Sequence, residues 1–75
     1  MMADNQSVVV QSNDVLSGTP VFRGTRVPVR TLFEYLDAGH PVREFREDFP
    51  TVTPEQIHAA IALARDAVLA DARPA

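Results

Sequence analysis

The seven basic side chains of this 75-residue sequence are all arginines, and they are its strongest candidates for recognition chemistry. A guanidinium group is planar and permanently charged, and it binds carboxylates or phosphates through two parallel hydrogen bonds. Arg23 and Arg26 flank a Gly-Thr pair, whereas Arg43 and Arg46 lie three residues apart on a short predicted helix. The first pair suits an acidic protein surface, and the second suits the phosphate groups of DNA.

Surface ion pairing is the other interpretation of Arg43 and Arg46, because the same short helix carries three carboxylates: Glu44, Glu47 and Asp48. Exposed pairs of this kind contribute at most ~1 kcal/mol and need no binding partner. The formal net charge of −3 also argues against a molecule-wide attraction to DNA or to an anionic membrane. It favours a partner with a basic surface. Both interpretations of the two arginines remain open at this point.

Residue types suited to catalysis or to metal binding are sparse. His40 and His58 are the only imidazoles, eighteen residues apart, and the sequence contains no cysteine. A metal site needs several ligands, and no His-Glu-x-x-His run is present. The carboxylates lie on the outer sides of the predicted helices, where they form solvated faces rather than buried pairs. We therefore expect no catalytic residues, no metal, no cofactor and no enzyme activity.

Residues 18–29 predict a small, rigid β-hairpin whose tip is Arg23-Gly24-Thr25-Arg26, called here the arginine corner. Gly24 supplies the positive φ that a tight connection needs, without a Cβ penalty. Proline has no N–H for a ladder, so two prolines mark the outer ends of the expected strands, which are Val21–Phe22 and Arg26–Val27 between Pro20 and Pro28. Val8–Val10 predicts one further short strand, followed by a turn at Asn13-Asp14.

Two helices are predicted after the hairpin. The first runs from Pro28 or Val29 to Ala38, with apolar residues at i, i+3, i+4 and i+7, and Gly39 is placed to end it. The second is short and covers Pro41 to Asp48.

A third predicted helix carries the clearest start signal and a broad apolar surface. Thr53, Pro54 and Gln56 form a capping box with proline at the first helical position. Beyond that start, an inward apolar stripe is expected at Ile57, Ala60, Ile61, Ala64 and Val68. Leu63, Ala67 and Ala70 widen the stripe to a second side, which indicates deep burial or a partner helix. We expect a C2-symmetric homodimer, with an interface formed by Ile57, Ile61, Leu63, Ala67 and Val68.

This order of elements predicts a mainly α fold: a three-helix, homeodomain-like or winged helix-turn-helix bundle preceded by a small β-hairpin element. In such a bundle the third helix enters the major groove, and glutamine at its start can read adenine. The capping box competes for the same amide of Gln56. The expected DNA-binding residues are Arg43, Arg46, Gln56 and His58.

A single domain over residues 8–70 is expected, between a disordered N-terminus (1–7) and a mobile tail (71–75). A domain of this size buries only ~60% of the surface of its unfolded chain. Disulfides are excluded, so packing against another chain is the expected supplement. No apolar run approaches the ~18 residues of a membrane span, and no signal peptide is recognisable, so the expected location is the cytoplasm.

Several runs of residues together carry a resemblance to a known family. They are Gly18 to Val29, read as Gly-x-Pro-Val-Phe-Arg-Gly-Thr-Arg-Val-Pro-Val, the helix end Ala38-Gly39, Asp48-Phe49-Pro50, and Thr53-x-Glu55-x-Ile57. On these residues, over positions 8–68, the chain resembles the small bacterial family called domain of unknown function 433. Thr19 stands where that family often has lysine, which removes one cation from the expected contact surface.

The resemblance implies a helical fold that is often dimeric, encoded beside a PIN-like ribonuclease and regarded as a VapB-like antitoxin. The expected function is neutralisation of that toxin by direct binding, with DNA binding to repress its own operon. PIN-like nucleases gather carboxylates around a divalent metal, where an arginine would fit. The expected toxin-binding residues are Arg23, Gly24, Thr25 and Arg26, and the rival candidate is Arg73 on the tail. The alternative is a protein interaction module without DNA activity.

Overall fold

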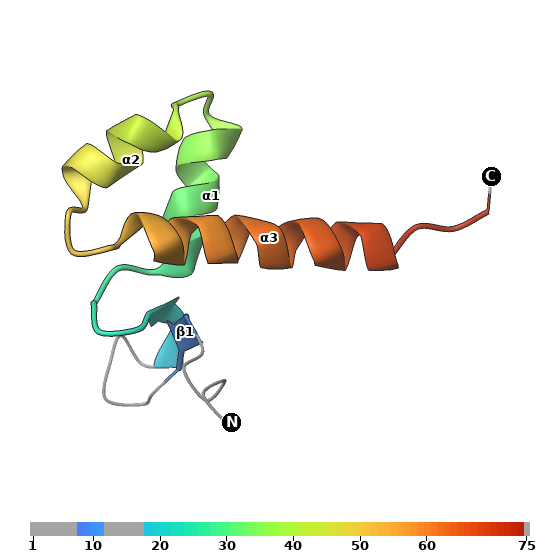
Figure 1. The fold of residues 1–75 in the computed structure, drawn as a ribbon, viewed down its shortest axis with the longest axis horizontal. Helices are drawn as coiled ribbons and strands as arrows, with labels where there is room; N and C mark the ends of the chain where they lie inside the picture. The colour runs from blue at the N-terminus through green and yellow to red at the C-terminus, as the bar shows by residue number, and fades with distance from the viewer. Residues whose placement is uncertain (1–7, 12–17, 75) are drawn as a thin grey trace.

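The structure is a computed structural model that describes residues 8–11 and 18–74, and it shows three helices after a small antiparallel sheet (Figure 1). The elements are β1 (Val9–Val10), β2 (Val21–Phe22), α1 (Val29–Asp37), α2 (Val42–Asp48) and α3 (Pro54–Ala70). The predicted fold class, a mainly helical bundle preceded by a β-hairpin element, is confirmed. The predicted disorder of residues 1–7 and the turn at Asn13-Asp14 lie outside the described residues.

Strand pairing differs from the prediction in one respect. The partner of β2 is β1, with Val9 opposite Phe22 and Val10 opposite Val21, whereas Arg26–Val27 forms no strand. The chain does fold back after the arginine corner, since Phe22 N–H donates to the Val27 carbonyl (3.1 Å) and Val29 N–H to the Pro20 carbonyl (3.1 Å).

The segment that folds back forms one isolated antiparallel β-bridge, between Val21 and Pro28. Pro28 occupies a position whose N–H would point away from β2, so the missing donor costs no ladder bond. The backbone then turns at once into α1, for which Pro28 is the N-cap. The hairpin turn was therefore predicted correctly. Its second strand does not form, because α1 begins directly after Pro28.

Helix boundaries follow the local signals closely. α1 ends at Asp37 with Ala38 as its C-cap, and Gly39 adopts φ +90°, the left-handed position that ends a helix. α2 begins at Val42, one residue later than predicted, because Pro41 has the extended backbone of an N-cap. At the start of α3 the capping box is confirmed: Gln56 N–H donates to Thr53 Oγ1 (3.1 Å), and Thr53 N–H donates to Gln56 Oε1 (3.0 Å).

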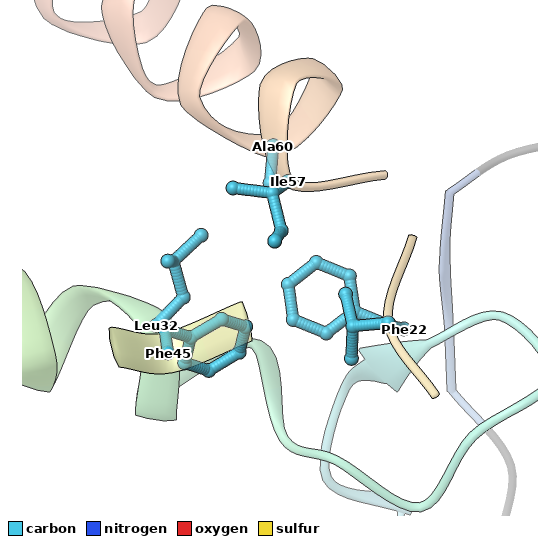
Figure 2. Close-up of a cluster of buried hydrophobic side chains, with 6 residues drawn as sticks. Phe22, Leu32, Phe45, Ile57 and Ala60 are labelled. Carbon is cyan, nitrogen blue, oxygen red and sulfur yellow. The ribbon is translucent and has the colours of Figure 1, made fainter. Parts of the chain in front are cut away.

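One small core joins β2 to all three helices. Figure 2 shows Phe22, Leu32, Phe45 and Ile57 converging from β2, α1, α2 and α3, with Ala60 on α3 above them. The Phe22 and Phe45 ring centroids lie 6.2 Å apart in a tilted arrangement, which is within the range of favourable aromatic contact. Burial of these few side chains fixes β2, and therefore the arginine corner that follows it, against the helical body.

The C-terminal half of α3 runs beyond α1 and α2 (Figure 1). Leu63, Val68 and Leu69 are exposed there by 57%, 71% and 66%. The prediction that the inward stripe of α3 continues as far as Val68 is therefore wrong. The apolar residues do recur at helical spacing, but α1 and α2 do not extend far enough along α3 to cover the last of them.

Candidate functional site

The arginine corner is held in one conformation by hydrogen bonds to its own backbone. Thr25 closes the turn onto Phe22, because its N–H (3.0 Å) and its hydroxyl (2.9 Å) both donate to the Phe22 carbonyl. Val27 N–H donates to Thr25 Oγ1 (3.0 Å), and Gly24 takes φ +80°. The prediction of positive φ at Gly24 is confirmed, and the hydroxyl of Thr25 is a structural part of the corner.

Two further hydrogen bonds tie Arg23 to other parts of the molecule. Its N–H donates to the Val8 carbonyl (2.8 Å), which continues the pairing with the β1 segment. Its carbonyl accepts from the side-chain amide of Gln56, at an Nε2–O distance of 2.9 Å. The corner is thus fixed to the first turn of α3, although 33 residues separate the two in the sequence.

The side chains that the corner presents are cationic. Arg23 and Arg26 are exposed, and so is Arg30 in the first turn of α1. No aspartate or glutamate occurs between Gly18 and Phe33, so this stretch carries three positive charges and no negative one. The corner is therefore a rigid cationic projection, suited to a negatively charged partner surface.

A second candidate surface is an open groove between α2 and the start of α3. A hollow of about 430 Å³ is lined by three charged residues of α2 and by residues around the start of α3: Arg43, Arg46, Glu47, Pro50, Val52, Thr53 and Pro54. An adjoining hollow of about 180 Å³ shares Arg46 and Pro54 and reaches His58 and Ile61. Three of the four residues predicted to bind DNA, Arg43, Arg46 and His58, thus lie around one groove.

Within the described residues, neither Arg43 nor Arg46 lies within 4.0 Å of a carboxylate. Two of the carboxylates considered as partners are engaged elsewhere. Glu44 Oε1 lies 2.9 Å from Nδ1 of His40, and Asp48 accepts a hydrogen bond of 2.6 Å from the Tyr35 hydroxyl. The surface ion pairs considered for these arginines are therefore not formed, and both guanidinium groups face the groove.

Gln56 differs from the other predicted DNA-binding residues. Its Oε1 accepts from Thr53 N–H and its Nε2 donates to the Arg23 carbonyl. Each of the two atoms that would read adenine thus makes one hydrogen bond within the chain, which fixes the side chain to the fold, and the base-reading role of Gln56 stays a prediction. The sequence contained a signal for the first bond, the capping box, but none for the second.

The residues expected at a dimer interface fall into two groups. Ile57 is only 2% exposed and packs in the core of its own chain, so its assignment to an interface needs correction. Ile61 is half-buried beside the groove. Leu63, Ala67 and Val68 are exposed on the projecting half of α3.

Arg73 is remote from the arginine corner. Its Nη2 lies 3.7 Å from Oδ1 of Asp71, just after α3, and both side chains are well exposed. In Figure 1 the C-terminus lies at the far end of α3 from the loop that joins β2 to α1. The two groups of toxin-binding residues predicted from the sequence therefore do not form one site.

In the described part of the chain, no three histidine, cysteine or acidic side chains are grouped as a metal site would require. Over the same residues, no helix has both the length and the apolar character needed to cross a bilayer.

Comparison with known proteins identifies the family. Residues 9–64 match the family described as protein of unknown function (DUF433), and the chain belongs to it. A relative in Sinorhizobium fredii (strain NBRC 101917 / NGR234), described as uncharacterized protein y4eO, is 42% identical over 59 residues. The match covers 79% of this chain but only 27% of that relative. No solved structure matches the chain.

Proposed function

We propose that this chain is the antitoxin of a type II toxin–antitoxin pair, and that it neutralises a PIN-like ribonuclease in the cytoplasm by binding to it directly. The observation that carries the proposal is the arginine corner, where two exposed guanidinium groups stand on a backbone fixed by hydrogen bonds. A preorganised loop loses little conformational entropy on docking. Its charge is opposite to that of a nuclease site built from carboxylates.

Self-association is part of the proposal. Part of the exposed apolar surface on the second half of α3 would be covered in a C2-symmetric homodimer, in which each copy supplies the same surface. Leu63, Ala67 and Val68 are the residues of this interface. Such pairing also adds buried apolar area to a domain whose own core is small.

DNA binding is the second candidate activity, and the groove between α2 and α3 favours it. Arg43 and Arg46 are exposed beside the N-terminal end of α3, which is where a helix-turn-helix protein contacts the phosphate backbone. With DNA binding the protein would also repress its own operon; without it, the chain is a protein interaction module only.

Co-expression with the product of the neighbouring gene, which the proposal expects to be a PIN-like nuclease, tests the proposal. Arg23→Ala with Arg26→Ala should abolish both rescue of growth and co-purification of the nuclease. Arg43→Ala with Arg46→Ala removes the same charge from the other surface and should leave both intact. Truncation after Val68 deletes Arg73 and should also leave both intact.

Three results would contradict this assignment. If the wild-type chain neither rescues growth nor co-purifies with the nuclease, the antitoxin function is rejected. If the Arg23/Arg26 double variant still neutralises whereas the truncated chain does not, the tail carries the inhibition. If both double variants fail equally, net charge rather than the arginine corner determines binding.

A further inference from the structure

The first turn of α3 contains a side chain that serves two elements at once. Gln56 lies at the third helical position, where its carbonyl oxygen completes the capping box with Thr53. Its NH₂ group points out of the helix to the Arg23 carbonyl at 2.9 Å. The amide therefore uses its acceptor for the helix and its donor for the arginine corner.

This position does not need glutamine for the helix alone. Glutamate satisfies a capping box equally well, because only an acceptor for the N-cap N–H is required. Glutamate also interacts more favourably with the positive end of the helix dipole. A carboxylate, however, has no N–H to donate, and it would place an anionic oxygen against the carbonyl oxygen of Arg23. The contact with the arginine corner explains why an amide stands here.

The anchor on the α3 side is firm. Ile57 and Ala60, one and four residues further along the helix, are 2% and 4% exposed in the core. The first turn of α3 is thus fixed to the body, and a hydrogen bond from it restrains the corner relative to that body. The bonds made by Thr25 set the shape of the turn. The bond from Gln56 adds to the buried Phe22 of β2 in setting the position of the turn on the helical body.

We propose that Gln56 is a positioning residue, which orders the arginine corner on the helical body and so holds Arg23 and Arg26 in the arrangement that binds the partner. The ordering concerns the chain alone, and only the identity of what the corner binds rests on the proposed function.

The test compares Gln56→Glu with Thr53→Ala. Gln56→Glu retains the acceptor of the capping box but removes the donor to Arg23. Thr53→Ala removes the bond from Gln56 N–H to the cap hydroxyl and leaves the Gln56 side chain in place. Amide hydrogen exchange of Thr25 and Val27, measured by NMR relative to amides of α1, reports the order of the corner in the free chain. Dissociation of the nuclease partner reports its binding.

For Gln56→Glu we expect the Thr25 and Val27 amides to exchange roughly fivefold faster, as the loss of one hydrogen bond implies. We expect the nuclease to dissociate faster by a similar factor. Thr53→Ala should lower the melting temperature but leave the corner amides and the dissociation rate unchanged relative to the wild type. A purely structural role for Gln56 would make the two variants alike.

Unchanged exchange at Thr25 and Val27 in Gln56→Glu would overturn the ordering role. Faster exchange with unchanged dissociation of the nuclease would overturn the positioning role in binding. If the wild-type chain does not bind the nuclease at all, the proposed function fails, and the exchange measurement still decides whether Gln56 orders the corner.

Discussion

The Tyr35 hydroxyl donates a hydrogen bond of 2.6 Å to Oδ2 of Asp48, and this bond links the last turns of α1 and α2. Aromatic contacts surround it, since the Tyr35 ring lies 5.4 Å from the Phe45 ring and 5.6 Å from the His40 ring, centroid to centroid. The hydrogen bond to Asp48, with smaller contributions from desolvation and from nearby negative charge, raises the pKa of Tyr35 above its ordinary value.

A pH titration follows from this bond. Because the pKa of Tyr35 is higher in the folded chain than the ordinary value of about 10, the bond contributes to the free energy of unfolding below about pH 10, and that contribution is lost as the pH rises through the folded pKa. Asp48→Asn should shift the pKa back towards 10 and reduce the loss of stability at high pH. Tyr35 is the single tyrosine and the sequence has no tryptophan, so phenolate absorbance reports it directly.

Asp37→Asn is the matched control for this titration, because Asp37 is an exposed carboxylate of the same helix as Tyr35. Its removal should leave the titration of Tyr35 unchanged. Identical titration curves for the wild type and Asp48→Asn would show that the hydroxyl of Tyr35 is not bonded to Asp48 in solution.

A substitution at Gly24 separates backbone strain from steric clash. A Cβ built on Gly24 would meet nothing within 4 Å, but the backbone has φ +80°. Gly24→Ala should therefore destabilise the fold by about 1 kcal/mol through conformation alone. Gly24→Asn should cost less, because asparagine tolerates left-handed φ. Chemical denaturation measures both, and an equal cost for the two variants would argue against this explanation.

Arginine substitutions in the groove test DNA binding. With a duplex of its own promoter, Arg43→Ala plus Arg46→Ala should weaken binding to all sequences alike. It should also reduce the slope of log K against log salt by about 1.8, since each lost phosphate contact removes about 0.9. Arg65→Ala is the control, because its guanidinium pairs with Asp66 (3.1 Å) away from the groove. Absence of wild-type binding even at low salt would leave the interaction module as the function.

Charged substitutions on the projecting half of α3 test the homodimer. Leu63→Glu with Val68→Glu should convert a dimer into a species of 8.2 kDa in analytical ultracentrifugation without loss of helix, because both side chains are exposed in the single chain. Leu69→Glu places a charge on the opposite side of the same helix and should leave the dimer intact. A wild-type chain that sediments at 8.2 kDa at micromolar concentration would remove the homodimer from the proposal.

The helices could be predicted because their signals are local. Thr53 and Gln56 lie three residues apart, and Gly39 needs only its own φ to end α1, so short windows of sequence contain the full information. The turn at Gly24 belongs to the same class. In each case the residue type and the backbone conformation are linked within one turn of the chain.

What the sequence did not reveal depends on distant parts of the molecule. The periodicity of α3 identifies the side of the helix on which Val68 lies. It does not show how far along α3 the other helices extend to cover that side. The choice of β1 as the partner of β2 and the bond from Gln56 to Arg23 join segments with no shared local pattern. The hydrogen bond from Tyr35 to Asp48 likewise requires α1 and α2 to pack together, whereas the contact of His40 with Glu44 is local, at a spacing of four residues.

The length of α3 affects how many nuclease molecules the proposed homodimer could bind. Its 17 residues span about 25 Å. Only the first half of α3 packs against the rest of the domain, and the second half projects from it (Figure 1). The arginine corner lies near the start of the helix, where Gln56 binds it. If the proposed homodimer pairs the projecting halves of two α3 helices antiparallel, the two arginine corners would lie at opposite ends of the dimer. Each corner could then bind its own copy of the proposed nuclease, and the proposed complex would contain two copies of each chain.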